Sequence, residues 1–109
     1  LFAVPSYWGD VPAQFKALID RCTPYADTNP LPGHPRPAAG KRVFAAALRA
    51  GGRTGECEHL LQCVEHWSGH MGAEYDGGVM LTRVDGKEDL TLEQEVSVKS
   101  AVNAWISKK

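Results

Sequence analysis

Two short turns carry the residues whose types and spacing favour binding chemistry. The first, residues 5–10, places Tyr7 and Trp8 between a proline and a glycine, and the second, residues 49–55, is rich in glycine. Glycine lets a backbone approach a ligand closely, and aromatic rings offer a flat apolar surface. Together the turns predict a site for a planar heteroaromatic ring that also needs amide N–H and C=O partners. The alternative is that Tyr7 and Trp8 are ordinary packing residues.

Neither turn has the character of a phosphate-binding loop. A helix N-terminus attracts anions, but Asp10, Glu56 and Glu58 put negative charge where the helices after the two turns are expected to begin. Arg49 and Arg53 offset part of this charge and are either solvated side chains or contacts for a phosphate of a ligand. If the ligand is a nucleotide, we expect its phosphate to be held elsewhere.

The helix expected after the second turn carries five residues of metal-ligating types, Cys57, His59, Cys63, His66 and His70. The last four fall on one stripe of the helix. All of them come from one helix, whereas a closed tetrahedral site usually draws on two elements. We therefore expect no metal site. The chain also lacks the nucleophile elbow of a Ser/His/Asp hydrolase, and we predict no catalytic side chain.

Apolar periodicity predicts the elements around the first turn. An apolar run at residues 1–4 predicts a buried strand. Asp10 is the expected N-cap of a helix that ends before Pro24. The apolar stripe of this helix is Val11, Phe15, Leu18, Ile19 and Cys22. The proline-rich residues 25–40 predict an irregular surface loop, either a plain connector or a lid.

A second strand and helix surround the second turn. Residues 41–48 form an apolar run that suits a strand buried on both faces. Thr54 is expected to cap the following helix, and Gly69 or Gly72 to end it. The apolar face of this helix is Cys57, Leu60, Leu61, Val64, Trp67 and Met71.

A third strand and helix complete the pattern. Residues 73–84 predict a strand, in which Gly77–Gly78 marks a bulge or a break. Thr91 and Gln94 have the spacing of a capping box at the start of the last helix. The buried face of that helix is expected at Val98, Ala101, Val102, Trp105 and Ile106.

The strand–helix order, repeated three times, predicts an α/β fold with a parallel sheet and helices on both faces. Three strands make a thin sheet, and the first strand has an open apolar edge of the kind that natural proteins cover. We therefore predict that residues 1–109 form a single incomplete domain, the carboxyl-terminal part of a larger one.

The overall charge and the lack of long apolar runs limit which kinds of binding partner the chain can have. The formal net charge is -1, which gives no general attraction to nucleic acid or to an anionic membrane surface. No apolar run approaches the length of a membrane span. Three cysteines, an odd number, favour reduced thiols and therefore a cytoplasmic protein.

The two turns also carry a resemblance to a known family. PSYWGDVPAQFKALIDR, from Pro5 to Arg21, is similar to the P-x-Y-x-G-x-x-x-x-x-x-K-x-x-x-D-R signature of flavodoxin-like NAD(P)H-dependent FMN reductases and quinone reductases. Residues 41–61 resemble the family's strand, glycine loop and helix, and residues 85–106 its final turn and helix. The resemblance implies a three-layer α/β fold with a parallel sheet of order 2-1-3-4-5, in which this chain supplies strands 3, 4 and 5.

The resemblance implies an FMN-binding oxidoreductase that passes hydride from NAD(P)H through the flavin to a small acceptor, a quinone or a flavin. It implies that the isoalloxazine ring is lined on one side by Pro5, Ser6, Tyr7, Trp8 and Gly9, and on the other by Ala50, Gly51, Gly52 and Gly55. Three departures stand out: the family's phosphate loop has no counterpart, Glu56 replaces the usual glycine, and Ala50 replaces a common hydroxyl.

The alternative is a non-catalytic remnant of such a domain that dimerises or swaps strands to cover its open sheet edge. For either function we expect a homo-oligomer.

Overall fold

Three parallel strands form the centre of the molecule. The computed structural model describes residues 1–108, in which β1 (Phe2–Pro5), β2 (Arg42–Leu48) and β3 (Glu74–Leu81) pair in the order β1-β2-β3. All three predicted strands are present, although β3 is shorter than residues 73–84. The prediction that the first strand is buried is wrong except at Val4, because one edge of β1 has no neighbour among residues 1–108. The register places Val4 beside Ala47.

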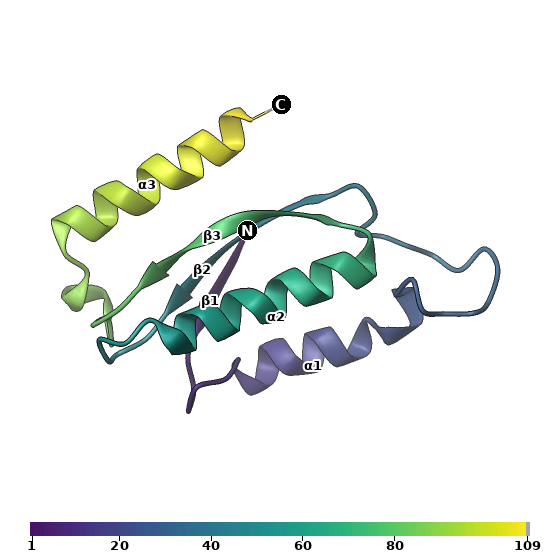
Figure 1. Cartoon of the computed structure of the whole chain (residues 1–109), viewed down its shortest axis with the longest axis horizontal. Coiled ribbons are helices and arrows are strands. Elements are labelled where there is room, and N and C mark those ends of the chain that lie inside the picture. The colour runs from purple at the N-terminus through teal and green to yellow at the C-terminus, as the bar shows by residue number, and fades with distance from the viewer. Residues whose placement is uncertain (109) are drawn as a thin grey trace.

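Helices cover both faces of this sheet (Figure 1). Helices α1 (Ala13–Arg21) and α2 (Gly55–Met71) lie side by side on one face, and α3 (Leu92–Ser107) lies on the other. A short 3-10 turn, η1 (Thr23–Tyr25), follows α1, and a second, η2 (Lys87–Asp89), precedes α3. The predicted α/β fold with three layers and a parallel sheet is therefore confirmed.

The main core lies between the sheet and α2. Successive strand residues point to opposite faces, so Val43, Ala45 and Ala47 face α2 and are buried. Phe44, between them, faces α3 and stacks on Trp105 with ring centroids 5.5 Å apart. The buried cluster is completed by Val4, Val11, Cys57, Leu60 and Val64. This alternation explains why β2 is apolar on both faces, as the sequence predicted.

A bulge interrupts β3 where the sequence predicted one. Val43 pairs with Tyr75 but Ala45 pairs with Gly78, so β3 gains one residue over this stretch. Gly77 has a φ of +99°, a left-handed conformation that favours glycine. A side chain on Gly78 would place its Cβ 2.4 Å from the carbonyl oxygen of Ala45. Both glycines are therefore required by the path of the backbone.

The carboxylate of Asp76, beside the bulge, fixes α3 to the sheet. It accepts hydrogen bonds from Arg42 Nε at 2.8 Å, Trp105 Nε1 at 2.8 Å and Lys108 Nζ at 3.1 Å. Arg42 also donates to the carbonyl oxygens of Trp105 and Lys108. The face prediction for α3 is wrong at Ile106, which is 66% exposed.

Helix ends follow local signals with two exceptions. The predicted capping box is present, because Thr91 Oγ1 accepts from Gln94 N and Gln94 Oε1 accepts from Thr91 N. Gly72 ends α2 in the left-handed conformation. Thr54 occupies the N-cap of α2, but its side chain makes no capping hydrogen bond.

The predicted cap of α1 is wrong. Pro12 is the N-cap residue, and the Asp10 carboxylate instead accepts a hydrogen bond from the neighbouring Val11 N. The helix still ends before Pro24, as predicted. Leu18 lies on the outer side and is half exposed, whereas the rest of the predicted stripe is at least partly buried.

Candidate flavin site and a second cluster

The two predicted turns lie next to each other at the carboxyl edge of the sheet. Ser6 N donates a 2.7 Å hydrogen bond to Leu48 O, so the first turn begins level with the end of β2. The second turn starts at the following residue, Arg49. Ligands of open α/β sheets bind beyond this edge. The fold therefore brings together two segments that are more than 40 residues apart in the chain.

The first turn is tight and presents its aromatic rings to solvent. Tyr7 and Asp10 exchange backbone hydrogen bonds, from Tyr7 N to Asp10 O at 2.8 Å and from Asp10 N to Tyr7 O at 3.1 Å. The central residues, Trp8 and Gly9, have φ of 55° and 80°, the pattern of a type I′ turn. Tyr7 is 61% exposed and Trp8 is fully exposed. Neither ring packs in the core, so the packing alternative is wrong.

The second turn is held to the segment after β3. Arg49 N donates to Leu81 O, Val84 N donates to Arg49 O, and Arg83 N donates to Gly51 O, each at 3.0 Å. Within residues 1–108, the amide N–H groups at positions 50–52 donate no hydrogen bond. They are therefore available to a ligand with carbonyl or ring-nitrogen acceptors.

A side-chain bridge joins the two turns. Ser6 Oγ donates to Glu56 Oε2 at 2.8 Å and accepts from Gly9 N at 3.2 Å. Arg49 Nε lies 3.4 Å from the same Glu56 oxygen. The sequence suggested Glu56 only as a charge that repels phosphate. Glu56 follows the glycine loop directly at the start of α2, and this position could have predicted that its side chain reaches the turn of residues 5–10.

Two arginine side chains lie against the glycines of the second turn. A Cβ on Gly51 would lie 2.5 Å from a guanidinium nitrogen of Arg49, and one on Gly52 would lie 2.6 Å from a guanidinium nitrogen of Arg83. Arg49 is therefore an engaged side chain, only 18% exposed, rather than a solvated one. Sequence reasoning missed Arg83, whose φ of 59° is unusual for a side chain of its size.

The remaining residues of the predicted flavin site lie at the same edge of the sheet. Pro5 is the last residue of β1, Ala50 is exposed beside the glycines, and Gly55 is the first residue of α2 with open space around it. Amides without a protein acceptor and exposed rings lie on this edge, and the Glu56 carboxylate lies at the N-terminus of α2, where an anion would otherwise bind.

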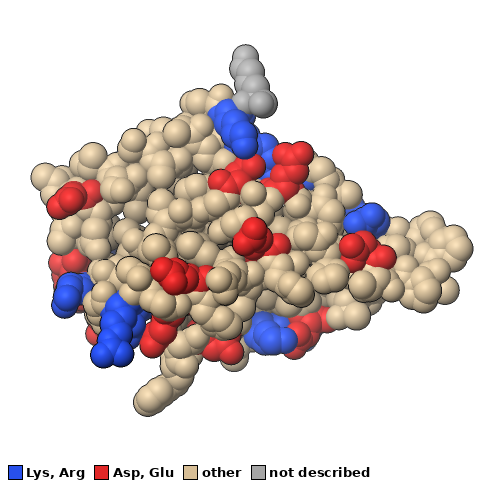
Figure 2. All heavy atoms as spheres, in the orientation of Figure 1, with Lys and Arg blue, Asp and Glu red and all other residues tan. Residues whose placement is uncertain are grey.

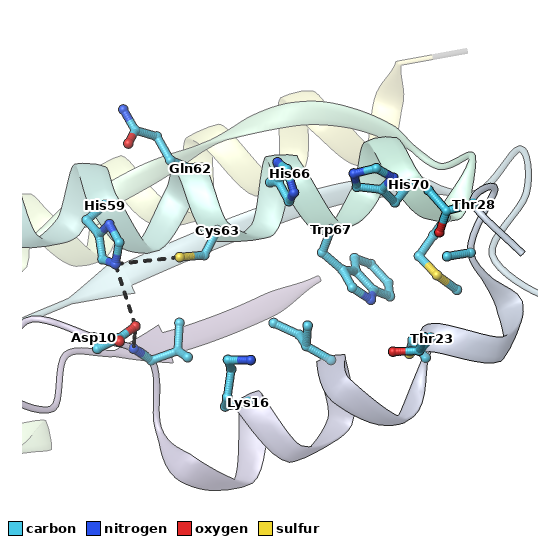
Figure 3. Close-up of a pocket in the computed structure, with 15 residues that line it drawn as sticks. Asp10, Lys16, Thr23, Thr28, His59, Gln62, Cys63, His66, Trp67 and His70 are labelled. Atoms are coloured by element: carbon cyan, nitrogen blue, oxygen red, sulfur yellow. Dashed lines mark hydrogen bonds and ion pairs between the residues drawn. The ribbon is translucent and has the colours of Figure 1, made fainter.

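A second feature lies between α1 and α2. A groove of about 540 Å³ runs there, with Trp67 and Met71 in its wall and Asp10, His59 and Cys63 at one end (Figure 3). His59 Nε2 lies 3.5 Å from Asp10 Oδ1 and 3.7 Å from Cys63 Sγ.

The thiol in this cluster is partly shielded from water. Burial raises the pKa of Cys63, and the Asp10 carboxylate raises it further, while Lys16 lowers it. This groove is separate from the glycine loop, and the sequence did not predict it.

Comparison with known proteins identifies the class. The fold is that of a flavodoxin-like α/β domain, and residues 1–83 match the model of the NADPH-dependent FMN reductase family. The chain belongs to this family. No curated protein matches it.

Solved structures agree on the fold. An NADPH-quinone reductase from P. pentosaceus superposes with a TM-score of 0.63 at 16% identity, covering 98% of this chain and 66% of that one. A thermophilic tryptophan halogenase from Streptomycin violaceusniger gives 0.60 at 15% identity, covering 99% and 65%. At these identities the likeness concerns the fold, which hosts different activities. The chain spans just under two thirds of the length of both proteins.

Charged side chains of both signs are mixed on the face that Figure 2 draws, without a large basic patch. Among residues 1–108, no helix has the length and apolar character needed to cross a membrane.

Proposed function

We propose that this protein binds FMN between the turns of residues 5–10 and 49–55 and takes part in NAD(P)H-dependent reduction of a quinone or a flavin. The observation that supports it is the joining of the two turns by the Ser6–Glu56–Arg49 bridge, in a chain of the FMN reductase family. The bridge leaves the aromatic rings and the amides of the glycine loop on the outer side.

The residues have distinct tasks in this proposal. Tyr7 and Trp8 stack against the ring system, and the amides at positions 50–52 donate hydrogen bonds to its polar edge. FMN, when bound, supplies the hydride-transfer chemistry, so no protein acid or base is required. The phosphate is held by residues outside the two turns. Arg53, which is exposed within the second turn, and Arg83, which lies against Gly52, are available to orient NADPH.

Titration of the purified protein with FMN tests this proposal. We expect saturable quenching of flavin fluorescence and a shifted visible spectrum. Tyr7→Ala and Trp8→Ala should each weaken binding by about 1–3 kcal/mol, the contribution typical of an aromatic stacking contact. Tyr25→Ala is the matched control, because Tyr25 is also exposed but lies in η1, away from the turns.

Turnover is the second readout. Oxidation of NADPH in the presence of FMN and a quinone should follow the same order of variants as flavin binding. A protein that neither quenches FMN nor changes its spectrum would overturn the proposal. Equal losses in Tyr25→Ala and Trp8→Ala would move the site away from the first turn.

As the alternative to this enzyme, we propose a non-catalytic domain in which a second copy of this chain covers the free edge of β1. Within residues 1–108, β1 pairs only with β2, and an unpaired edge is a template for association. Light scattering should then give at least a dimer, and a compact monomer would exclude it. The three cysteines are all free, which fits the reducing cytoplasm that we propose as the location.

A further inference from the structure

Three metal-ligating side chains meet at the end of the groove between α1 and α2 (Figure 3). His59 and Cys63 come from α2, and Asp10 comes from the end of the first turn, 49 positions before His59. One donor atom from each residue lies within 4.8 Å of the other two. From the sequence no metal site was expected, because the donors considered all lay on one helix. Asp10 adds a donor from a second element.

The spacing of the donors suits a tetrahedral cation. Around zinc, with bonds of about 2.0–2.3 Å, two tetrahedral ligand atoms lie about 3.4–3.6 Å apart. His59 Nε2 lies 3.5 Å from Asp10 Oδ1 and 3.7 Å from Cys63 Sγ. These two separations need almost no adjustment. His59 and Cys63 are four residues apart, a spacing that places two ligands on one side of a helix.

The chemistry of the donors selects the type of ion. A thiolate, an imidazole and a carboxylate together suit zinc, whereas magnesium and calcium prefer a shell of oxygen atoms. Asp10 and His59 are about half exposed or more, so an ion can enter directly from solvent. Three protein ligands with an open fourth position are typical of zinc sites that retain a water molecule.

We propose that Asp10, His59 and Cys63 form a binding site for Zn²⁺, with water as the fourth ligand. Coordination replaces the thiol proton of Cys63, which passes to solvent. Lys16 lines the same groove, and its ammonium group is paired with the Asp20 carboxylate on the exposed side of α1. The site does not overlap the open amides of the glycine loop, and its occupation requires no flavin.

Cobalt is the direct probe of this site. Co²⁺ added to protein freed of metal by a chelator should produce a thiolate-to-cobalt charge-transfer band together with the intense visible bands of a tetrahedral ion. Zn²⁺ should then displace Co²⁺ and abolish both. The absence of the charge-transfer band in the unsubstituted protein would overturn the proposal without recourse to any variant.

Substitutions locate the ligands. Asp10→Asn, His59→Gln and Cys63→Ser should each weaken Zn²⁺ binding, measured by calorimetry, by at least about tenfold, since even changes to outer partners of metal ligands cost this much. The matched controls are His66→Gln and Cys22→Ser, which alter the same residue types in the wall of the same groove. They should leave the affinity unchanged.

The control variants also show which result would contradict the proposed zinc site. A loss in His66→Gln or Cys22→Ser as large as in His59→Gln or Cys63→Ser would assign the ion to other residues and overturn the site. Far-ultraviolet circular dichroism confirms that each variant is folded. Because the readout is metal binding to flavin-free protein, its result is independent of whether FMN binds.

Discussion

Ser6 Oγ donates a 2.8 Å hydrogen bond to Glu56 Oε2, which joins the turn after β1 to the first turn of α2. Ser6 also accepts from Gly9 N, so one hydroxyl both orders its own turn and attaches it to the next element.

Removing the Ser6 hydroxyl should destabilise the protein. We expect Ser6→Ala to lower the free energy of unfolding by about 1 kcal/mol, the typical net value of such a hydrogen bond. Urea denaturation measures the change. Ser100→Ala, on the exposed side of α3, is the control and should have little effect. An equal midpoint for both variants would show that the bridge does not stabilise the fold.

Glu56 should discriminate against phosphate. Glu56→Gln keeps an oxygen that can accept from Ser6 but removes negative charge from the helix N-terminus. We expect FMN binding to tighten by about twofold to fivefold, as for one charge at a helix end. Riboflavin, which lacks the phosphate, should bind equally to both proteins. If the substitution changes the affinity for riboflavin as much as for FMN, charge is not the cause.

The lowered pKa of Asp76 should make the free energy of unfolding depend on pH in the acidic range. The hydrogen bond from Arg42, followed by those from Trp105 and Lys108, lowers the pKa of Asp76 from 3.8 to about 2. A carboxylate with a lowered pKa stabilises the fold above its unfolded pKa and loses this effect as the pH falls through its folded pKa. Stability should therefore fall between about pH 4 and pH 2.

Asp76→Asn provides the comparison for that pH profile. The variant should be less stable at neutral pH and should lose stability less steeply over the acidic range, as measured by urea denaturation at each pH. Glu95→Gln is the control, because Glu95 has a lowered pKa from Lys99 on the same exposed helix but does not hold α3 to the sheet. Parallel profiles for Asp76→Asn and the parent would contradict this assignment.

The bulge should resist substitution. Gly78→Ala places a methyl group 2.4 Å from Ala45 O and 2.8 Å from Leu61 Cδ2, and we expect a loss of about 1–3 kcal/mol from overpacking. Gly69→Ala, within α2 and with open space around it, should instead gain about 0.5–1 kcal/mol from helix propensity. Thermal denaturation of the two variants should shift in opposite directions, and shifts of the same sign would refute the argument.

Local signals made most of the fold predictable from the sequence. The apolar run of β2, the glycine pair of the bulge, Gly72 and the Thr91–Gln94 box each act within a few residues, and each was confirmed. The helix faces were less predictable. Leu18 and Ile106 fit the apolar periodicity, but exposure also depends on how far the neighbouring layer extends, which no local pattern encodes.

The sites were predictable only in part. The position of both turns followed from strand ends, whereas the Ser6–Glu56 contact depends on how two distant segments pack. Asp10 shows the same limit. Its residue type and position predicted a helix cap, but the entry of α1 through Pro12 directs its carboxylate towards His59 on the adjacent helix.

The weak attachment of α3 to the sheet means that this helix should open before the rest of the fold. This helix has no fully buried residue, and a few polar contacts with one ring stack hold it to the sheet. Segments with little buried apolar surface exchange their amide hydrogens through small local openings, whereas central strands exchange only when the whole fold is lost. In hydrogen–deuterium exchange, α3 should therefore become labelled well before β2. Trp105, which leaves Phe44 when the helix detaches, is a fluorescent reporter of that first step.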